Sequence, residues 1–438
     1  MDIEAGIRAA ESNPRELEQL FQAARQRGQA EVFQSALLSC HETAPGNLLY
    51  AAWFHRFQQA ADESARPRRG VNWIAAVPLS ILTGLIFWAL SDVERLVVLD
   101  RIPQLLLWWS PIATMSALVF MALTSRKNYG RTMALGLGLL SATAYAAILA
   151  PTLNAPWLAD QYIVLAAIHI PLLCWLALGI SVLGLKSSTG DRFAFLVKSI
   201  EVMIIAGLYL IAGMVFGSIT VGMFAALGIE LPDIWLRLIA AGGFGLLPVL
   251  AVATGYDPST PPSEQDFDQG LSKLVATMMR LLLPLTLGVL VIYVLVIPFN
   301  FLAPYGNRDV LIVYNLMLLA ILGLLLGATP IRGDMLSPGL QKWLRTGIIV
   351  VAILAELVSI YALSATVFRT LEGSLTPNRL TIIGWNSINI GILFWLIYRQ
   401  FKDDHEKWVK SLQSVFSLAT NAYLVWGWFL LLAIPLLF

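Results

Sequence analysis

Long apolar segments recur along most of this chain, and they constrain its fold more than any other feature. From residue 71 onward, runs of about 20 mainly apolar residues follow one another, each long enough to cross the ~30 Å hydrocarbon core of a membrane as a helix. Hydrophobic residues make up 58% of the chain and charged residues 13%, against roughly 45–50% and about 25% in soluble proteins. An ordinary soluble fold is therefore excluded. The sequence predicts an all-α polytopic membrane protein.

The apolar runs can be counted and placed. We expect about eleven membrane spans, near residues 71–90, 105–124, 132–150, 161–185, 199–226, 233–254, 274–298, 310–328, 346–367, 380–398 and 414–437.

Lys and Arg residues alternate between the loops in a way that predicts the orientation. The N-terminal flank and the loops after the second, fourth, sixth, eighth and tenth spans carry 17 of them, against five in the other loops. Positive residues favour the cytoplasmic side of short loops. We therefore predict that the N-terminus is cytoplasmic and that Phe438 lies outside.

Residues 1–70 differ from the rest of the chain. They are rich in charged residues, and most of their apolar residues recur at helical spacing between these charges. Asn13 is a candidate helix cap, with Pro14 at the first helical position and Glu16 at the capping-box position. Two further amphipathic segments follow. We predict a cytoplasmic helical domain of three or four short helices in residues 1–70, followed by a transmembrane bundle in residues 71–438. This domain either docks a cytoplasmic protein partner or packs without one.

Motifs for common chemistries are absent from the sequence. There is no P-loop and no His-Glu-x-x-His pair, and of the four histidines only His169 lies in a predicted span. A single histidine in a span is more often hydrogen-bonded packing than a metal ligand. The net charge of +1 argues against a nucleic-acid partner. We expect no cofactor, no metal and no catalytic residue.

Small residues one turn apart suggest close helix contacts. Gly213 and Gly217 form one such pair, and Gly323 and Gly327 form another. We interpret both pairs as packing positions, because small residues allow membrane helices to approach closely.

Ionisable residues inside spans are costly and are therefore default functional candidates. Glu201 follows Lys198 by three residues, and a local ion pair accounts for it. Arg280 and Glu356 lie deeper, and flanking basic residues place their depths about 6 Å apart at the rise of a helix. We expect Glu356 to face the bundle interior, either paired with Arg280 or protonated in a polar cavity.

Three asparagines in neighbouring spans extend this group. The candidate intramembrane polar site consists of Arg280, Glu356, Asn315, Asn386 and Asn389. These residues either line a polar interior of the last four or five helices or bond helix to helix, at about 1 kcal/mol for each bond.

Two outer loops supply a second candidate site. It consists of Asn307, Arg308, Asp309, Thr376, Asn378 and Arg379. The two arginines lie on the side that positive charge disfavours, and we expect them to be close together if they share one site. Thr376 or Asn378 is expected to cap the tenth span. The alternative is ordinary turn chemistry with interfacial arginines.

The segment Leu375-Thr376-Pro377-Asn378-Arg379, which opens an apolar helix, resembles a signature of the domain of unknown function 4153 family. The resemblance extends over about residues 200–400. It implies a multi-span protein of the bacterial inner membrane. It implies no activity and no catalytic residue.

Three functions remain open from the sequence. The first is a non-enzymatic scaffold or regulator that contacts membrane lipids and docks a partner through residues 1–70. The second is a permease for a small solute or a lipid-linked molecule, through a polar interior of the last five helices. The third is a membrane transferase that acts on a lipid-linked substrate, although the outer loops are short for such an enzyme.

Overall fold

The computed structural model describes residues 3–26, 29–65, 70–99, 102–184, 186–267, 270–332, 336–404 and 407–438. The chain divides into two compact units, Met1–Gly70 and Val71–Phe438, each of which is described by itself. Residues 66–69, just before the predicted boundary between residues 1–70 and 71–438, lie outside the described residues.

The first unit is a small helical domain with its own core. Its helices are α1 (Ile3–Ala9), α2 (Pro14–Gln26), α3 (Ala30–Thr43) and α4 (Leu48–Ala65). Asn13 caps α2 as the sequence predicts, because its Oδ1 accepts from the Glu16 amide at 3.3 Å and its Nδ2 donates to the Glu16 carboxylate at 3.2 Å. Phe33 and Trp53 are buried in a cluster that draws on all four helices. The amphipathic faces seen in the sequence therefore pack against one another.

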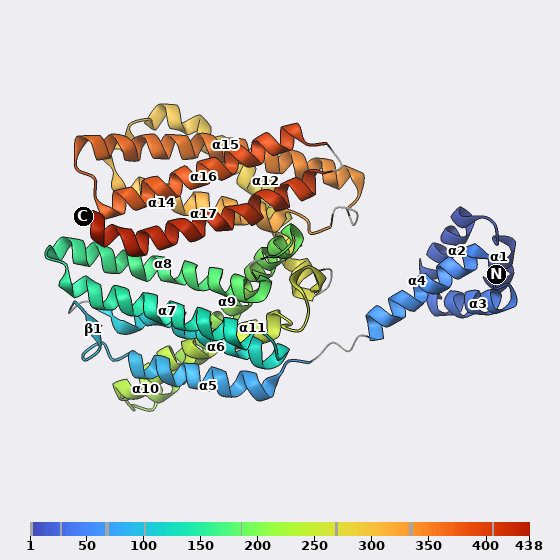
Figure 1. Ribbon diagram of the computed structural model, residues 1–438, viewed down its shortest axis with the longest axis horizontal. Coiled ribbons are helices and arrows are strands. Elements are labelled where there is room, and N and C mark those ends of the chain that lie inside the picture. The colour runs from blue at the N-terminus through green and yellow to red at the C-terminus, as the bar shows by residue number, and fades with distance from the viewer. Residues whose placement is uncertain are drawn as a thin grey trace. The chain divides into compact units, whose positions relative to one another are not determined.

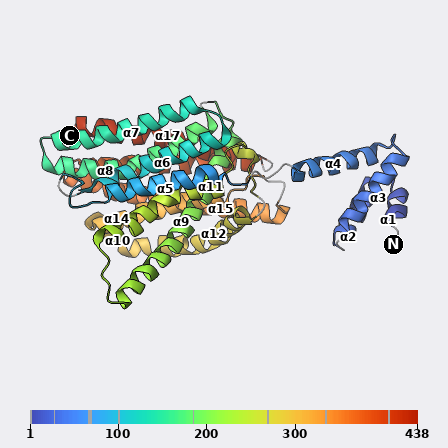
Figure 2. The ribbon, with the colours of Figure 1, turned by 90° about the horizontal axis from the view of Figure 1, so that it is seen from below.

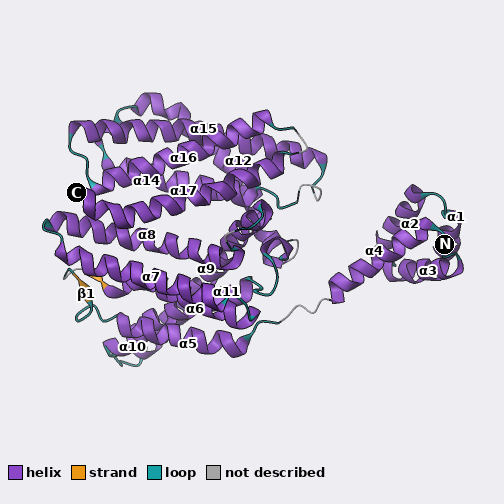
Figure 3. Ribbon diagram, viewed as in Figure 1, coloured by secondary structure: helices purple, strands orange, loops and turns teal. Residues whose placement is uncertain are grey.

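The second unit consists almost entirely of helices. Its α-helices are α5 (Trp73–Leu90), α6 (Gln104–Ser125), α7 (Tyr129–Leu149), α8 (Pro156–Leu183), α9 (Thr189–Ala226), α10 (Asp233–Arg237), α11 (Gly243–Gly255), α12 (Gly270–Val296), α13 (Ala303–Gly306), α14 (Arg308–Ala328), α15 (Pro338–Glu372), α16 (Pro377–Lys402) and α17 (Trp408–Leu437). The unit also contains three short 3₁₀ turns and one π-helical segment. These are η1 (Ala150–Thr152), η3 (Pro262–Glu264) and η4 (Ile297–Asn300), and the π-helical η2 (Leu238–Gly242). One hairpin pairs the two-residue strands β1 (Val97–Val98) and β2 (Ile102–Pro103) (Figure 3).

Within the described ranges, eleven helices are long and apolar enough to cross a membrane. They coincide with the eleven predicted spans, and the all-α polytopic prediction is confirmed. The N-terminal end of α5 and the basic loops after α6, α8, α11, α14 and α16 lie at the right of the bundle in Figure 1. We call this the basic end.

The spans form two groups that meet at α8, α9 and α17. Helices α5, α6, α7, α8 and α11 pack together in one group, and α12, α14, α15, α16 and α17 in the other (Figure 1). Contacts of α8 with α17, and of α9 with both α11 and α17, join the groups. The large apolar core is in the second group and reaches the base of α9.

Helices α5 and α11 approach closely because glycines face each other. A Cβ at Gly84 would lie 2.7 Å from the Gly242 carbonyl oxygen, and one at Gly245 would lie 2.7 Å from the Gly84 Cα. Gly242 ends the π-helical segment η2, a local widening of the helix that often occurs at functional sites.

The two glycine pairs noted in the sequence make weaker contacts. A Cβ at Gly213 or Gly323 would meet nothing within 4 Å, whereas one at Gly217 would approach Ile239 and one at Gly327 would approach Met279. Each pair therefore contributes one packing position rather than two.

Helix α9 is the longest span and is only partly covered by its neighbours. Figure 2 shows its C-terminal part standing apart from the other helices. Met214, Phe216 and Met223 on this part are more than half exposed. This exposed apolar surface is what a lipid-facing helix presents.

Candidate functional site

The five residues of the candidate intramembrane site are spread over four helices and do not bond to one another. Within the described residues, no hydrogen bond or ion pair joins any two of them. The Arg280 Nε on α12 and the Glu356 Oε2 on α15 are each buried without a hydrogen-bond partner.

Of the two predicted settings of Glu356, the ion pair with Arg280 is absent from the described part of the structure, and helix register explains why. The other setting, a protonated Glu356 in a polar cavity, stays a prediction. Gly347 of α15 lies level with Leu283 of α12, because a Cβ at Gly347 would be 2.9 Å from the Leu283 side chain. Both helices begin at the basic end, Arg280 is three residues before Leu283, and Glu356 is nine residues after Gly347. Those twelve residues separate the two charges by about 18 Å along the helix axes at 1.5 Å per residue. The expected difference of about 6 Å was too small, because counting from basic residues ignores how the helices are offset.

Two of the asparagines make hydrogen bonds within the bundle. Asn315 donates to the Leu311 carbonyl of its own helix at 2.8 Å. Asn389 of α16 accepts from the Tyr423 hydroxyl of α17 at 2.9 Å, which links two helices. Asn386 is fully buried, and neither of its amide atoms has a partner.

His169 is held in one tautomer by two partners. Its Nδ1 is 2.7 Å from the Leu165 carbonyl oxygen, and its Nε2 accepts from the Trp385 indole N–H at 2.9 Å. Because a carbonyl accepts only and an indole N–H donates only, the ring is neutral with its proton on Nδ1. His169 thus joins α8 to α16, as expected for hydrogen-bonded packing.

The outer-loop residues show turn chemistry wherever they are described. Thr376 caps α16, since its hydroxyl accepts from the Arg379 amide at 3.3 Å. The Arg379 guanidinium donates to the Ser374 carbonyl at 2.6 Å, within its own loop. Asn307 ends α13, and Asn378 lies in the first turn of α16. The side chains of Arg308 and Asp309 lie outside the described residues, so a shared site with Arg379 stays a prediction.

A buried ion pair links the base of α9 to the start of α12. Lys198 and Glu201 are 5% and 6% exposed, and their Nζ and Oε2 atoms are 2.7 Å apart. The ammonium also donates to the Asp266 carbonyl at 2.9 Å and to the Ser272 hydroxyl at 3.0 Å. The local pairing expected from sequence is confirmed, and the structure adds one acceptor from α12 and one from the loop before it.

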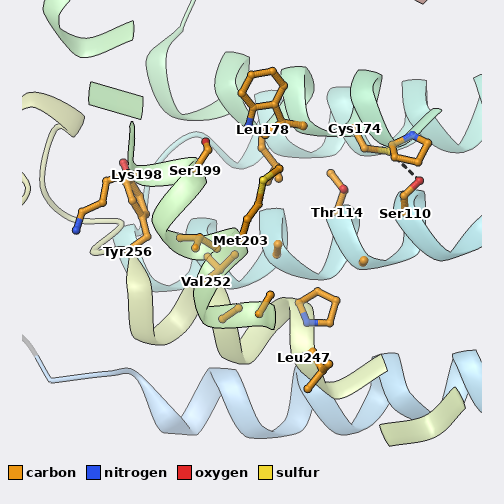
Figure 4. Close-up of a pocket in the computed structure, with 18 of the residues that line it drawn as sticks. Ser110, Thr114, Cys174, Leu178, Lys198, Ser199, Met203, Leu247, Val252 and Tyr256 are labelled. Atoms are coloured by element: carbon orange, nitrogen blue, oxygen red, sulfur yellow. Dashed lines mark hydrogen bonds between the residues drawn. The ribbon is translucent and has the colours of Figure 1, made fainter. Parts of the chain in front are cut away.

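An apolar cavity of about 390 Å³ lies between α6, α8, α9 and α11. Figure 4 shows Lys198 and Tyr256 together at one end and Ser110 and Cys174 toward the other. Its wall on α6 runs from Trp109 to Met121, twelve residues or about 18 Å, which exceeds half of the ~30 Å hydrocarbon thickness. The volume lies in the range of about 300–1,000 Å³ found for small-molecule sites.

Some polar groups in the wall of this cavity are bonded to the protein, whereas the Trp175 indole N–H is buried there without a partner among the described residues. The Cys174 thiol donates to the Ser110 hydroxyl at 3.8 Å, and the Ser199 hydroxyl donates to the Phe195 carbonyl at 2.8 Å. Most of the lining residues are apolar, so the surface offered to a ligand is mainly apolar. Met203, at the edge of the cavity, is 60% exposed, so the cavity reaches the lipid-facing surface of the bundle.

A polar recess of about 360 Å³ lies at the basic end. It is formed where α6 and α8 end, where α7 and α9 begin, and by the loop after α11. Lys127, Lys186, Asn128 and Ser188 line it.

Hydrogen bonds hold the wall of the recess in place. Asp191 accepts from the backbone amide and hydroxyl of Ser263 through one oxygen and from the Ser188 hydroxyl through the other. The Gln265 side chain donates to the Asp257 and Thr260 carbonyls within the same loop. The recess is therefore preorganised and not a gap between loose segments.

The cavity and the recess share Met121, Val182 and Tyr256 in their walls. The Tyr256 ring stands at the junction, and its hydroxyl makes no hydrogen bond within the described residues. Burial raises the pKa of this hydroxyl, with smaller contributions from Asp257 and Asp191. It stays protonated at neutral pH and is able to donate a hydrogen bond to a ligand that spans the two spaces.

No group of three or more His, Cys, Asp or Glu side chains suited to a metal occurs in the part of the chain that the structure describes. Comparison with protein-family models, with curated proteins and with solved structures gives no match for this chain. The site must therefore be interpreted from its own geometry.

Sequence reasoning placed the site in the last five helices, whereas the cavity lies among earlier spans. Its apolar wall residues are indistinguishable in sequence from packing positions. The signals in the sequence are weak: a glycine at position 207 within an apolar span, and Lys127 and Lys186 in two successive basic loops, which line the recess.

Proposed function

We propose that this multi-pass membrane protein binds an amphiphilic, lipid-like molecule, with the apolar tail in the cavity and the polar head in the recess. The observation that carries the proposal is that the two spaces are adjacent and share Met121, Val182 and Tyr256 in their walls. One space is apolar and reaches the lipid-facing surface; the other is polar and lies at the ends of the spans. An amphiphile in a membrane has the same arrangement of apolar and polar parts.

The proposal includes a location and a direction. The basic loops favour a cytoplasmic position for the recess by the positive-inside rule, and in this proposal the molecule enters from the cytoplasmic leaflet. With the resemblance to the domain of unknown function 4153 family, this gives a transporter-like protein of the bacterial inner membrane. Docking of a cytoplasmic partner through residues 1–70 remains a separate prediction.

A cavity-filling variant tests the proposal. Gly207 lines the cavity on α9, and a Cβ there would meet nothing within 4 Å. Gly207→Phe therefore places a ring in the space that the tail would occupy. Gly213→Phe is the matched control, because Gly213 is on the same helix, is equally open and does not line the cavity.

Native mass spectrometry of protein extracted in a mild detergent measures the result. We expect one retained lipid per chain in the wild type and in Gly213→Phe, and its loss in Gly207→Phe. Equal retention in all three proteins would contradict the proposal.

A further inference from the structure

The polar recess has spare hydrogen-bond donors but no spare carboxylate. Lys127 and Lys186 line it, and neither ammonium has an acceptor within the described residues. Asp191 is the only carboxylate among the described lining residues, and both of its oxygens already accept from Ser188 and Ser263. Asp191 keeps its negative charge, but the two free ammonium groups outnumber it, so the recess favours an anionic head group over a cationic one.

Further positive charge supports this part of the wall from behind. The Arg131 guanidinium donates to the Ser181 carbonyl at 3.3 Å, and Arg192 donates to the Ser187 hydroxyl at 2.8 Å. Ser181 and Ser187 both line the recess. Two guanidinium groups therefore add to the positive potential of the recess, and the ammonium groups of the two lysines stay free to bind a ligand.

The position of the recess matches that of a phospholipid head group. It lies where the helices end, directly next to an apolar space that begins at Tyr256. Basic pockets between membrane helices on the cytoplasmic side are suited to anionic lipid head groups. The Tyr256 hydroxyl, at the junction, is placed to donate to the ester region that joins head and tail.

Resting on the proposed function, we infer that the bound amphiphile carries a phosphate group, which Lys127 and Lys186 bind in the recess while its acyl tail fills the cavity. The ligand class is an anionic glycerophospholipid or another lipid phosphate. A free phosphate would share the head-group contacts but would leave the apolar cavity unused.

The test compares a lipid phosphate with the same lipid without its phosphate and with phosphate alone. Delipidated protein in detergent is titrated with dioleoyl-phosphatidic acid, with dioleoylglycerol and with inorganic phosphate, and bound ligand is counted by native mass spectrometry. We expect phosphatidic acid to bind more tightly than both. Lys127→Gln combined with Lys186→Gln should weaken its binding about 30-fold, as two contacts of about 1 kcal/mol each predict, and should leave dioleoylglycerol binding unchanged.

A double variant at the same end of the bundle is the control. Lys342 and Lys410 are exposed and lie outside the recess. Lys342→Gln combined with Lys410→Gln should leave phosphatidic acid binding within about twofold of the wild type, since general surface attraction falls off within a Debye length.

The outcomes separate the inference from the proposed function. Equal affinity for phosphatidic acid and dioleoylglycerol, or an equal effect of the two double variants, would overturn the phosphate inference while the cavity proposal stands. If inorganic phosphate binds as tightly as phosphatidic acid, the ligand is a soluble phosphate, and the claim that the phosphate belongs to a lipid is overturned. If neither lipid binds and Gly207→Phe changes nothing, the proposed function itself fails.

Discussion

Removing the carboxylate of Glu201 should destabilise the transmembrane unit strongly. Its partner Lys198 is 5% exposed and bonds to three acceptors: Glu201, the Asp266 carbonyl and the Ser272 hydroxyl. Glu201→Ala leaves two neutral acceptors around a buried ammonium. Breaking a buried ion pair in this way costs about 3–5 kcal/mol, because one charge stays buried without compensation.

The double replacement Lys198→Met with Glu201→Leu should be less destabilising than Glu201→Ala alone. Apolar side chains of similar volume remove both charges together, and such exchanges are often neutral or stabilising. Glu264→Ala is the control, because Glu264 is exposed at the same end of the bundle; we expect a change within about 0.5 kcal/mol, as for surface substitutions generally.

Reversible unfolding of the purified protein in mixed micelles, followed as the denaturing detergent is increased, measures these free energies. If the free energy of unfolding of Glu201→Ala lies within about 1 kcal/mol of the wild-type value, the pair contributes no more than a surface ion pair and the reasoning fails. It fails equally if the double variant is less stable than the single one.

Three further predictions follow from contacts in the bundle. Gly245→Ala should lower thermal stability sharply, because its Cβ would lie 2.7 Å from a backbone atom of α5, whereas Gly213→Ala should not, because its Cβ would be in open space. The melting temperatures of the two variants can be compared with a fluorescent fusion analysed by size exclusion. Equal melting temperatures would refute the contact. Trp385→Phe should cost about 1–3 kcal/mol in the same unfolding assay, because the buried His169 Nε2 loses its donor; an unchanged unfolding curve would refute that bond. A reporter that is active only in the cytoplasm should be silent when fused after Phe438, and a strong signal would refute the predicted orientation.

The spans were predictable because they depend on one property, the length of an apolar run. Each run from residue 71 onward contains enough apolar residues to cross the hydrocarbon core, and no competing fold can bury them. Helix caps were predictable for a similar reason, since Asn13 and Thr376 act on neighbours three residues away. Local rules of this kind need no knowledge of the tertiary structure.

Contacts between helices were harder to predict. The offset of α12 against α15 keeps Arg280 and Glu356 apart, and nothing in either span encodes that offset. The close approach at Gly84 and Gly245 likewise depends on which helices become neighbours. A Gly-x-x-x-Gly spacing marks a surface that allows close packing, but it does not identify the partner helix.

The cavity was invisible in the sequence for the same reason. Thr114 and Ala117 are 6% and 2% exposed and would pass for core residues, yet both line the space between α6, α8, α9 and α11. Whether such residues enclose a core or a cavity depends on how four helices fit together. Only a structure provides that information.

Photo-crosslinking with a phosphatidic acid that carries a photoreactive group midway along one acyl tail tests the central claim most directly. If the tail occupies the cavity, peptide mapping will place the label on Thr114, Ala117 and Met203, and Gly207→Phe will remove the label from the two buried positions. Labelling confined to outward-facing residues such as Leu285, which is 64% exposed on α12, would show that lipid only surrounds the bundle and would contradict the account.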